Sequence, residues 1–280
     1  MGMCMIYIFT ALYPEAKPLL RTFSLKRSET ELPFEVYENK DRSLRLVITG
    51  AGMNAAACGV SAVFGRYGAG ETDHLINVGT CAGNGTFGDM YLCNKITERN
   101  TGHTYYPDIL YRHGLREAEI ITEPTVWNGG KEKGVLHDME AAAVYQAGSF
   151  WLGPHQMSFI KVVSDGGISE RMTPQVLERS MEINLGLLET YVGGLSRISE
   201  QNEEQEKREQ YHMEEAEQIC QELHCSQTMR AAVIQCLKYW TLAGVDYQGL
   251  FNDMRENNEL PCRDRREGKK RFEEIKKRLL

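Results

Sequence analysis

The chain has 280 residues, of which 42% are hydrophobic and 25% charged, and its formal net charge at pH 7 is -7. A chain of this length buries enough apolar surface to fold without disulfides, and its eight cysteines are scattered without a CxxC pair. These features exclude a disulfide-rich secreted miniprotein and a zinc ribbon, and they favour reduced thiols in a cytoplasmic protein.

Along the first two hundred residues, strand-like and helix-like segments alternate, which is typical of an α/β sheet domain. The expected strands are 5–11, 44–49, 74–78, 119–122 and 159–163. The expected helices are 15–25, 54–64, 139–148 and 176–195. The apolar run at residues 1–12 has no basic flank and is too short to cross a membrane, so neither a signal peptide nor a membrane span is expected.

Beyond Ser199 the composition changes to Glu, Gln, Lys and Arg and contains no strand candidate. This change predicts a boundary between a domain at residues 1–198 and a small all-α domain at residues 199–280. The four helices expected in the second domain are 203–223, 227–242, 247–257 and 264–280, with Ser226 and Asp246 as N-caps and Gly244 as a helix breaker.

The last expected helix is basic. Residues 263–280 contain nine Lys or Arg and four acids, a net +5, which leaves -12 for residues 1–262 given the total of -7. A basic helix of this kind is usually a solvated face. Contact with nucleic acid or with an acidic protein through this helix is the alternative interpretation.

A glycine-rich turn follows the second strand. Residues 50–55 (GAGMNA) fit a relaxed GxGxxA dinucleotide-binding pattern, which brings backbone N–H groups close to an anion at a helix N-terminus. The acidic residue expected at the end of the next strand is missing, because that strand continues into Gly79 and Thr80. The turn alone is therefore compatible with a dinucleotide, with another anion or with no ligand.

Four motifs taken together narrow these possibilities: ITGAGMNAAA (48–57), INVGTCAGNG (76–85), DMEAAAVYQAG (138–148) and IKVVSDGG (160–167). In this order they resemble the purine nucleoside phosphorylase and methylthioadenosine/S-adenosylhomocysteine nucleosidase superfamily, over about residues 4–197. The resemblance implies an α/β fold, a three-layer sandwich around a mixed, partly barrel-like β-sheet. It also implies cleavage of the N-glycosidic bond of a nucleoside by water or phosphate, without a metal or an organic cofactor.

The resemblance assigns catalytic roles to three residues. Asp165 matches the general acid that protonates the leaving purine at N7, and Ser164 would hold its carboxyl group in place. Glu15 matches a glutamate that helps to activate the attacking water. Without the resemblance, Asp165 would be interpreted as a loop cap and Glu15 as a surface acid in the first turn of a helix.

Substrate-binding roles follow in the same way. Glu140 matches the acid that binds the ribose hydroxyls, and Met139 matches the residue that packs against the sugar. Thr80 matches a hydroxyl that touches the nucleophile, and the backbone N–H groups of the turn at Gly52 and Met53 would do the same. An ordinary acid at a helix N-terminus is the alternative interpretation of Glu140.

Two positions depart from the family. Phosphorylases commonly carry an Arg where this chain has Asn77, and the loss of that cation favours hydrolysis over phosphorolysis, in which phosphate would be the co-substrate. The base-pocket stretch also differs. Val126 and Trp127 lie near the position where the family stacks the purine, although Trp127 could equally belong to a core or an interface.

The sequence therefore predicts a nucleosidase that acts on a purine nucleoside or a 5′-modified adenosine and works as a homodimer or higher homo-oligomer. Phosphorolysis of the same bond is the enzymatic alternative. A non-catalytic protein that senses a nucleoside or associates with nucleic acid is the alternative from another class.

Overall fold

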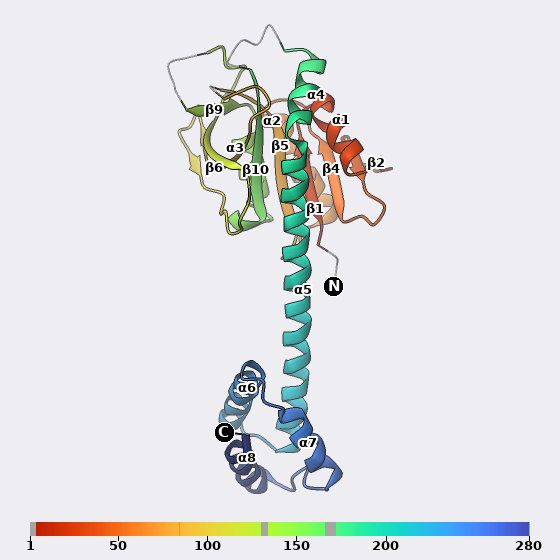
Figure 1. Cartoon of the computed structure of the whole chain (residues 1–280), viewed down its shortest axis with the longest axis vertical. Coiled ribbons are helices and arrows are strands. Elements are labelled where there is room, and N and C mark those ends of the chain that lie inside the picture. Colours follow the sequence, from red (N-terminus) through yellow and green to blue (C-terminus); the bar gives the residue numbers. More distant parts are fainter. Residues whose placement is uncertain (1–3, 84, 130–133, 166–171, 280) are drawn as a thin grey trace. The chain divides into compact units, whose positions relative to one another are not determined.

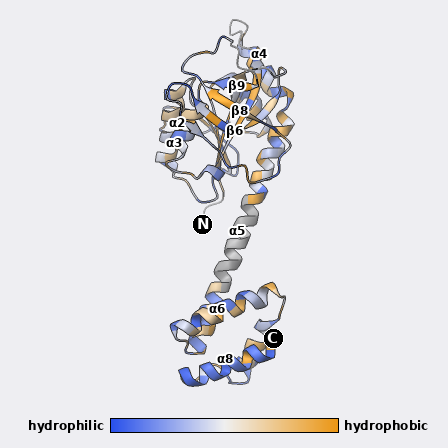
Figure 2. Cartoon of the chain, turned by 90° about the vertical axis from the view of Figure 1, so that its left-hand side faces the viewer, coloured by the Kyte–Doolittle hydropathy of each residue, from blue (hydrophilic) through white to orange (hydrophobic). Residues whose placement is uncertain are grey.

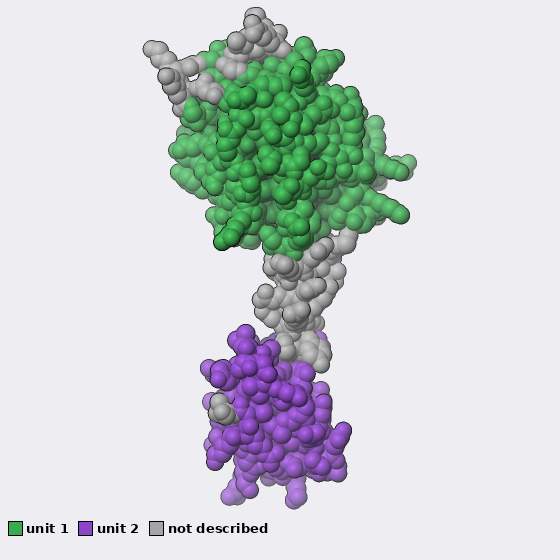
Figure 3. All heavy atoms as spheres, viewed as in Figure 1, with its two compact units in different colours: residues 1–201 green, residues 202–280 purple. Residues whose placement is uncertain are grey.

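The computed structural model describes residues 4–83, 85–129, 134–165 and 172–279, without the side chains of residues 199–212. The chain divides into two compact units, residues 1–201 (unit 1) and residues 202–280 (unit 2), which Figure 3 shows in two colours. Within the described ranges, no helix has the length and apolar character needed to cross a membrane.

Unit 1 is built on one ten-stranded sheet (Figure 1). Its strands are β1 (Ile6–Thr10), β2 (Lys26–Arg27), β3 (Glu35–Glu38), β4 (Leu44–Ile48), β5 (His74–Ala82), β6 (Met90–Glu98), β7 (Thr104–Tyr105), β8 (Arg116–Thr122), β9 (Val135–Asp138) and β10 (Met157–Asp165). The order β10-β6-β8-β9-β5 closes on itself because β10 also pairs with β5, which makes a five-stranded mixed barrel. From β5 the sheet extends outward through β1, β4, β3 and β2, while β7 pairs with β6.

Helices cover both faces of this sheet. On one face α2 (Met53–Tyr67) and α3 (Ala141–Gly148) contribute Phe64 and Val144 to a buried cluster. On the other face α1 (Tyr13–Thr22), α4 (Pro174–Ile183) and the first part of α5 (Leu185–Glu222) contribute Leu19, Met181 and Leu188. A short 3-10 helix, η1 (Pro154–Gln156), precedes β10. The layered α/β architecture around a partly closed mixed sheet is confirmed.

Several predictions of local structure are wrong. The single helix predicted over residues 176–195 is two helices, because the helix is interrupted at Asn184. The side-chain amide of Asn184 donates to the carbonyl of Gly88. Residues 203–222 are helical as predicted, but they do not start a new helix, because α5 continues through Ser199. Strands β6 and β9 escaped prediction because neither alternates strictly between apolar and polar residues.

Unit 2 consists of the end of α5 with α6 (Gln227–Leu242), α7 (Tyr247–Glu256) and α8 (Arg265–Leu279). The predicted N-caps are confirmed, since the side chains of Ser226 and Asp246 accept hydrogen bonds from backbone amides one turn on. Gly268 of α8 lies so close to Leu223, the residue directly after α5, that a Cβ atom there would overlap the carbonyl oxygen of Leu223. Figure 2 shows that α8 is predominantly hydrophilic, as expected of the basic last helix.

Candidate active site

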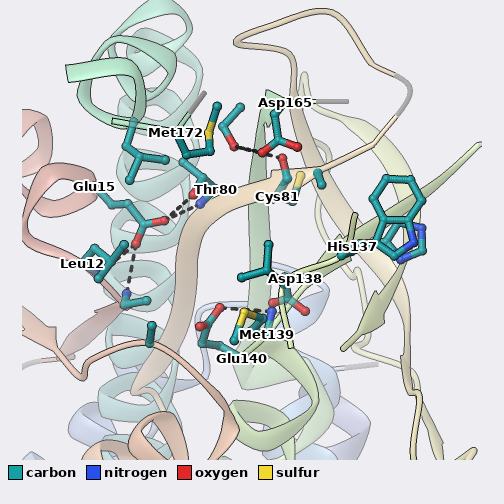
Figure 4. Close-up of a pocket in the computed structure, with 17 residues that line it drawn as sticks. Leu12, Glu15, Thr80, Cys81, His137, Asp138, Met139, Glu140, Asp165 and Met172 are labelled. Carbon is teal, nitrogen blue, oxygen red and sulfur yellow. Dashed lines mark hydrogen bonds between the residues drawn. The ribbon is translucent and has the colours of Figure 1, made fainter. Parts of the chain in front are cut away.

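A cavity of about 290 Å³ lies where the parallel strands β1, β5 and β10 end (Figure 4). Ligands of α/β sheets commonly bind outside the carboxyl ends of parallel strands. Eight of the ten site residues predicted from the sequence line the cavity: Glu15, Thr80, Val126, Trp127, Met139, Glu140, Ser164 and Asp165. The lining residues do not include Gly52 and Met53, which lie at the start of α2.

Glu15 enters the cavity from the first turn of α1 and is only 3% exposed. Its Oε1 accepts hydrogen bonds from the backbone N–H and the hydroxyl of Thr80, each at 2.7 Å. Its Oε2 accepts from the N–H groups of Ala11 at 3.2 Å and Leu12 at 3.0 Å. Glu15 therefore caps its own helix and joins α1 to the end of β5, and it is not a surface acid.

Glu140 stands at the N-terminus of α3, where one carboxylate oxygen accepts the N–H of Gly52 at 2.7 Å and the other accepts the N–H of Met139 at 3.3 Å. The Gly52 amide, expected to face a nucleophile, is thus used by Glu140. Burial, assisted by the nearby carboxylate of Asp138, raises the pKa of Glu140 to about 7, although Lys161 acts in the opposite direction.

Asp165 ends β10, immediately after an irregularity in the pairing of β10 with β5 between Val163 and Asp165. A bulge of this kind turns a side chain out of its regular alternation. The hydroxyl of Ser164 lies 3.3 Å from Asp165 Oδ2 and 3.3 Å from the carbonyl oxygen of Cys81, so it contacts the carboxyl group that it was expected to hold. Figure 4 shows Glu15, Glu140 and Asp165 on different sides of the cavity.

Sequence reasoning missed a buried ion pair between Asp138, which lines the cavity, and Lys161, which does not. Lys161 of β10 is 1% exposed, and its Nζ lies 2.8 Å from Asp138 Oδ2. Asp138 also accepts hydrogen bonds from the hydroxyl of Thr122 and the N–H of Ala141, both at 2.8 Å. Burial alone would lower the pKa of Lys161, but Asp138 and Glu140 outweigh it and hold that pKa above its usual value. The available signal was a lone Lys inside the apolar run of residues 159–163.

The aromatic part of the cavity wall is a stack of Trp127 on His137. Their ring centroids are 4.0 Å apart and their planes differ by 6°. The Nδ1 of His137 lies 2.9 Å from Glu123 Oε1, and Arg99 binds the same carboxylate through Nη2 at 2.8 Å. Burial alone would raise the pKa of Glu123, but hydrogen bonds from Arg99 and His137 hold it below its usual value. Trp127 therefore lines the cavity on a supported platform, while neighbouring Val126 is 53% exposed.

The described residues that line the cavity include four carboxylates and neither Lys nor Arg. Asn77, which the motif resemblance aligns with the phosphorylase Arg, is buried and donates its amide to the carbonyl of Phe9 at 3.2 Å. In the described part of the chain, no cluster of three or more His, Cys, Asp or Glu side chains could hold a metal ion.

No protein-family model matches the chain, and no curated protein matches its sequence. Solved structures of nucleosidases are similar to it. S-adenosylhomocysteine nucleosidase from Streptococcus pyogenes, solved with 5-methylthiotubericidin, matches with a TM-score of 0.59 at 17% identity, over 70% of this chain and 98% of that one. The 5′-methylthioadenosine/S-adenosylhomocysteine nucleosidase from Colwellia psychrerythraea, solved with adenine, matches with a TM-score of 0.57 at 18% identity, over 69% and 96%.

The chain has the nucleosidase fold. Futalosine hydrolase from Helicobacter pylori shares it, with a TM-score of 0.55 at 13% identity over 69% of this chain and 98% of that one. The fold that the four motifs implied is thus confirmed for about seven-tenths of the chain, and the rest is unmatched in these structures.

Proposed function

We propose that this protein hydrolyses the N-glycosidic bond of a purine nucleoside or a 5′-modified adenosine. The observation that carries the proposal is the convergence of Glu15, Glu140 and Asp165 on one cavity, although they belong to α1, the start of α3 and the end of β10. The shared fold with nucleosidases and futalosine hydrolase supports the same class of reaction.

In this mechanism Asp165 donates a proton to the leaving base. Breaking the bond makes the ribosyl carbon cationic, and a protonated purine departs as a neutral molecule, so the proton transfer lowers the barrier. Ser164 contacts the Asp165 carboxyl group and keeps it directed at the base. The Trp127 indole, stacked on His137, supplies an aromatic surface beside that base.

Glu140 binds the ribose. A carboxylate accepts two hydroxyl hydrogen bonds, and its negative charge stabilises the cationic sugar in the transition state. The Gly52 N–H at 2.7 Å fixes the orientation of the carboxylate, and Met139 packs beneath the sugar.

Glu15 and Thr80 position the attacking water. The Thr80 hydroxyl donates to Glu15, so its oxygen keeps a lone pair that can accept a hydrogen bond from water. A proton released by that water then has a path through Thr80 to the Glu15 carboxylate. This arrangement accounts for a glutamate that is 3% exposed at the edge of the cavity.

Water suits the cavity better than phosphate does. The described lining contains four carboxylates and neither Lys nor Arg, and these carboxylates would repel a phosphate dianion but not an uncharged nucleophile. Phosphorolysis is the second candidate because the fold belongs to a superfamily that also includes phosphorylases.

The test is to incubate purified protein with a panel of nucleosides, with and without phosphate, and to separate free base, ribose and ribose 1-phosphate. Release of base and free ribose without phosphate supports hydrolysis. Cleavage that strictly requires phosphate refutes hydrolysis in favour of phosphorolysis. If no nucleoside is cleaved but one raises the melting temperature, the protein is a nucleoside sensor.

The homo-oligomer implied by the resemblance and a nucleic-acid or protein contact of α8 stay predictions. Light scattering after size-exclusion chromatography measures the first. A salt-dependent binding titration with a short oligonucleotide measures the second.

A further inference from the structure

A second cavity, of about 250 Å³, lies in unit 1 between the segment that precedes β8 and the first part of α5. It is nearly as large as the cavity at the strand ends, and the two cavities share no lining residue. The proposed reaction does not use any residue of the second cavity. The segment before β8 contributes the polar residues Tyr111, Arg112 and His113, and α5 contributes Thr190, Tyr191 and Arg197.

The charge on the wall of the second cavity is opposite to that of the candidate active site. Its described lining contains Arg112 and Arg197 and neither Asp nor Glu, whereas four carboxylates line the other cavity. Within the described part of the chain, neither of these arginines forms an ion pair. A guanidinium group binds a carboxylate or a phosphate through two parallel hydrogen bonds. The second cavity therefore suits an anion.

The tyrosines of the second cavity have hydroxyl groups that are already engaged within the protein. The Tyr111 hydroxyl lies 3.0 Å from Nε2 of His74, and the Tyr191 hydroxyl lies 2.7 Å from Oγ of Ser158. The same Ser158 oxygen lies 2.8 Å from His74 Nε2. Burial lowers the pKa of His74 to about 3, so this network carries no charge at neutral pH. The tyrosines therefore contribute ring surface to the cavity, and the two arginines are left to anchor a ligand.

His113 adds an atom whose hydrogen-bonding capacity the protein does not use. Its side chain is 9% exposed and its Nε2 lies 3.8 Å from Oε1 of Glu117, but its Nδ1 is buried without a hydrogen-bond partner among the described residues. Buried polar atoms nearly always have a partner, and an exception needs an explanation such as a bound water or ion. This exception belongs to a residue that lines the second cavity, so it supports an occupant there.

The rest of the wall is apolar and comes from both segments: Leu115, Leu187, Leu195 and Ile198. A doubly charged phosphate would lose more hydration against such a wall than a singly charged carboxylate would. Cavities for drug-sized ligands commonly measure about 300–1,000 Å³, so this smaller cavity suits a smaller molecule. We propose that the second cavity binds a small organic carboxylate, whose charged group meets Arg112 and Arg197 and whose apolar body packs against the leucines. This inference is independent of the proposed function.

Gly194 offers a way to fill the second cavity. It lies within α5 and lines the cavity, and a Cβ atom added there would meet no atom within 4 Å. In Gly194→Leu the new side chain occupies this space, and leucine also favours a helix more than glycine does. The neighbouring Gly193 is exposed, has equally open space at its Cβ position and does not line the cavity. Gly193→Leu is therefore the matched control.

The test titrates para-fluorobenzoate into the full chain and follows its fluorine NMR signal, with para-fluorobenzyl alcohol as an uncharged probe of similar shape. We expect a dissociation constant of about 1 mM or tighter for the carboxylate, and binding weaker by about tenfold or more for the alcohol. Arg112→Gln and Arg197→Gln should each weaken carboxylate binding about tenfold. Arg27→Gln, which removes an exposed charge on β2, should change it by less than about twofold. Gly194→Leu should abolish binding, whereas Gly193→Leu should retain it.

The location and the chemistry of the site are tested separately. Binding that survives in Gly194→Leu overturns the location, and equal binding of the alcohol or of the carboxylate by both arginine variants overturns the role of charge. No binding of the carboxylate at about 10 mM, or tighter binding of inorganic phosphate, overturns the proposal. The arginine variants change exposed side chains, so they decide the matter even if Gly194→Leu melts below wild type. None of these measurements requires nucleoside cleavage, so the proposed function stands or fails independently.

Discussion

Replacing Glu15 by Gln should destabilise the protein as well as inactivate it, because the four hydrogen bonds received by Glu15 leave no place for an amide. In one orientation the new NH₂ group would face the N–H groups of Ala11 and Leu12. In the other it would face the N–H of Thr80, whose hydroxyl can rotate and accept. The better orientation thus leaves one buried backbone N–H without an acceptor and weakens the rest, a loss of about 2–4 kcal/mol.

For a folding unit of this size, each kcal/mol lowers the melting temperature by about 2–4 °C, so Glu15→Gln should melt about 4–16 °C below wild type. Differential scanning calorimetry measures this, and a nucleoside cleavage assay below both transitions measures activity. The matched control is Glu178→Gln, which removes a partly exposed partner of Lys17 and Arg21 and should change stability by less than about 1 kcal/mol. A melting temperature of Glu15→Gln equal to that of the control would refute the reasoning.

Four further outcomes are expected. Asp165→Asn should lower kcat by at least about a hundredfold with little change in melting temperature, and wild-type turnover would contradict its role as general acid. Because burial raises the pKa of Glu140 to about 7 and the carboxylate is the active form, kcat/KM should fall as the pH drops below about 7 and level off above it; a profile flat between about pH 5 and 8 would contradict this. Trp127→Ala should raise the KM for the nucleoside about tenfold or more, whereas Trp127→Phe should retain most of the affinity. The inhibition constant of the free base, measured in competition with the nucleoside, checks both variants. Gly268→Ala should destabilise unit 2 by about 1–3 kcal/mol or more, because the added methyl group overlaps a backbone carbonyl that cannot move away. Thermal circular dichroism measures the loss of stability, and nucleoside cleavage at low temperature is the control.

The sequence predicted those elements whose start and end are marked by residues within or next to the element itself. Strand β1, strand β4 and helix α6 are continuous segments with clear start and stop residues, and they form where they were expected. The cavity residues were found because Glu140 and Asp165 lie in short motifs at the ends of elements, where the family resemblance could be applied position by position.

What the sequence could not supply depends on contacts between distant segments. Lys161 meets Asp138 because β10 and β9 lie on either side of β5, and nothing local to residue 161 announces that partner. The stack of Trp127 on His137 likewise joins the segment after β8 to strand β9, the parallel neighbour of β8. Gly52 was assigned to an anion, and the anion that it binds is the protein's own Glu140.

Helix α5 has a consequence for the order in which the chain folds during synthesis. The core of unit 1 includes Leu188, Tyr191, Val192 and Leu195, all from the first part of this helix. Unit 1 therefore cannot complete its core until these residues have left the ribosome, although the segments that carry Glu15, Glu140 and Asp165 emerge earlier. The same continuous helix also carries the first core residues of unit 2, Ala216 and Ile219, which are synthesised after the core of unit 1 is complete in sequence.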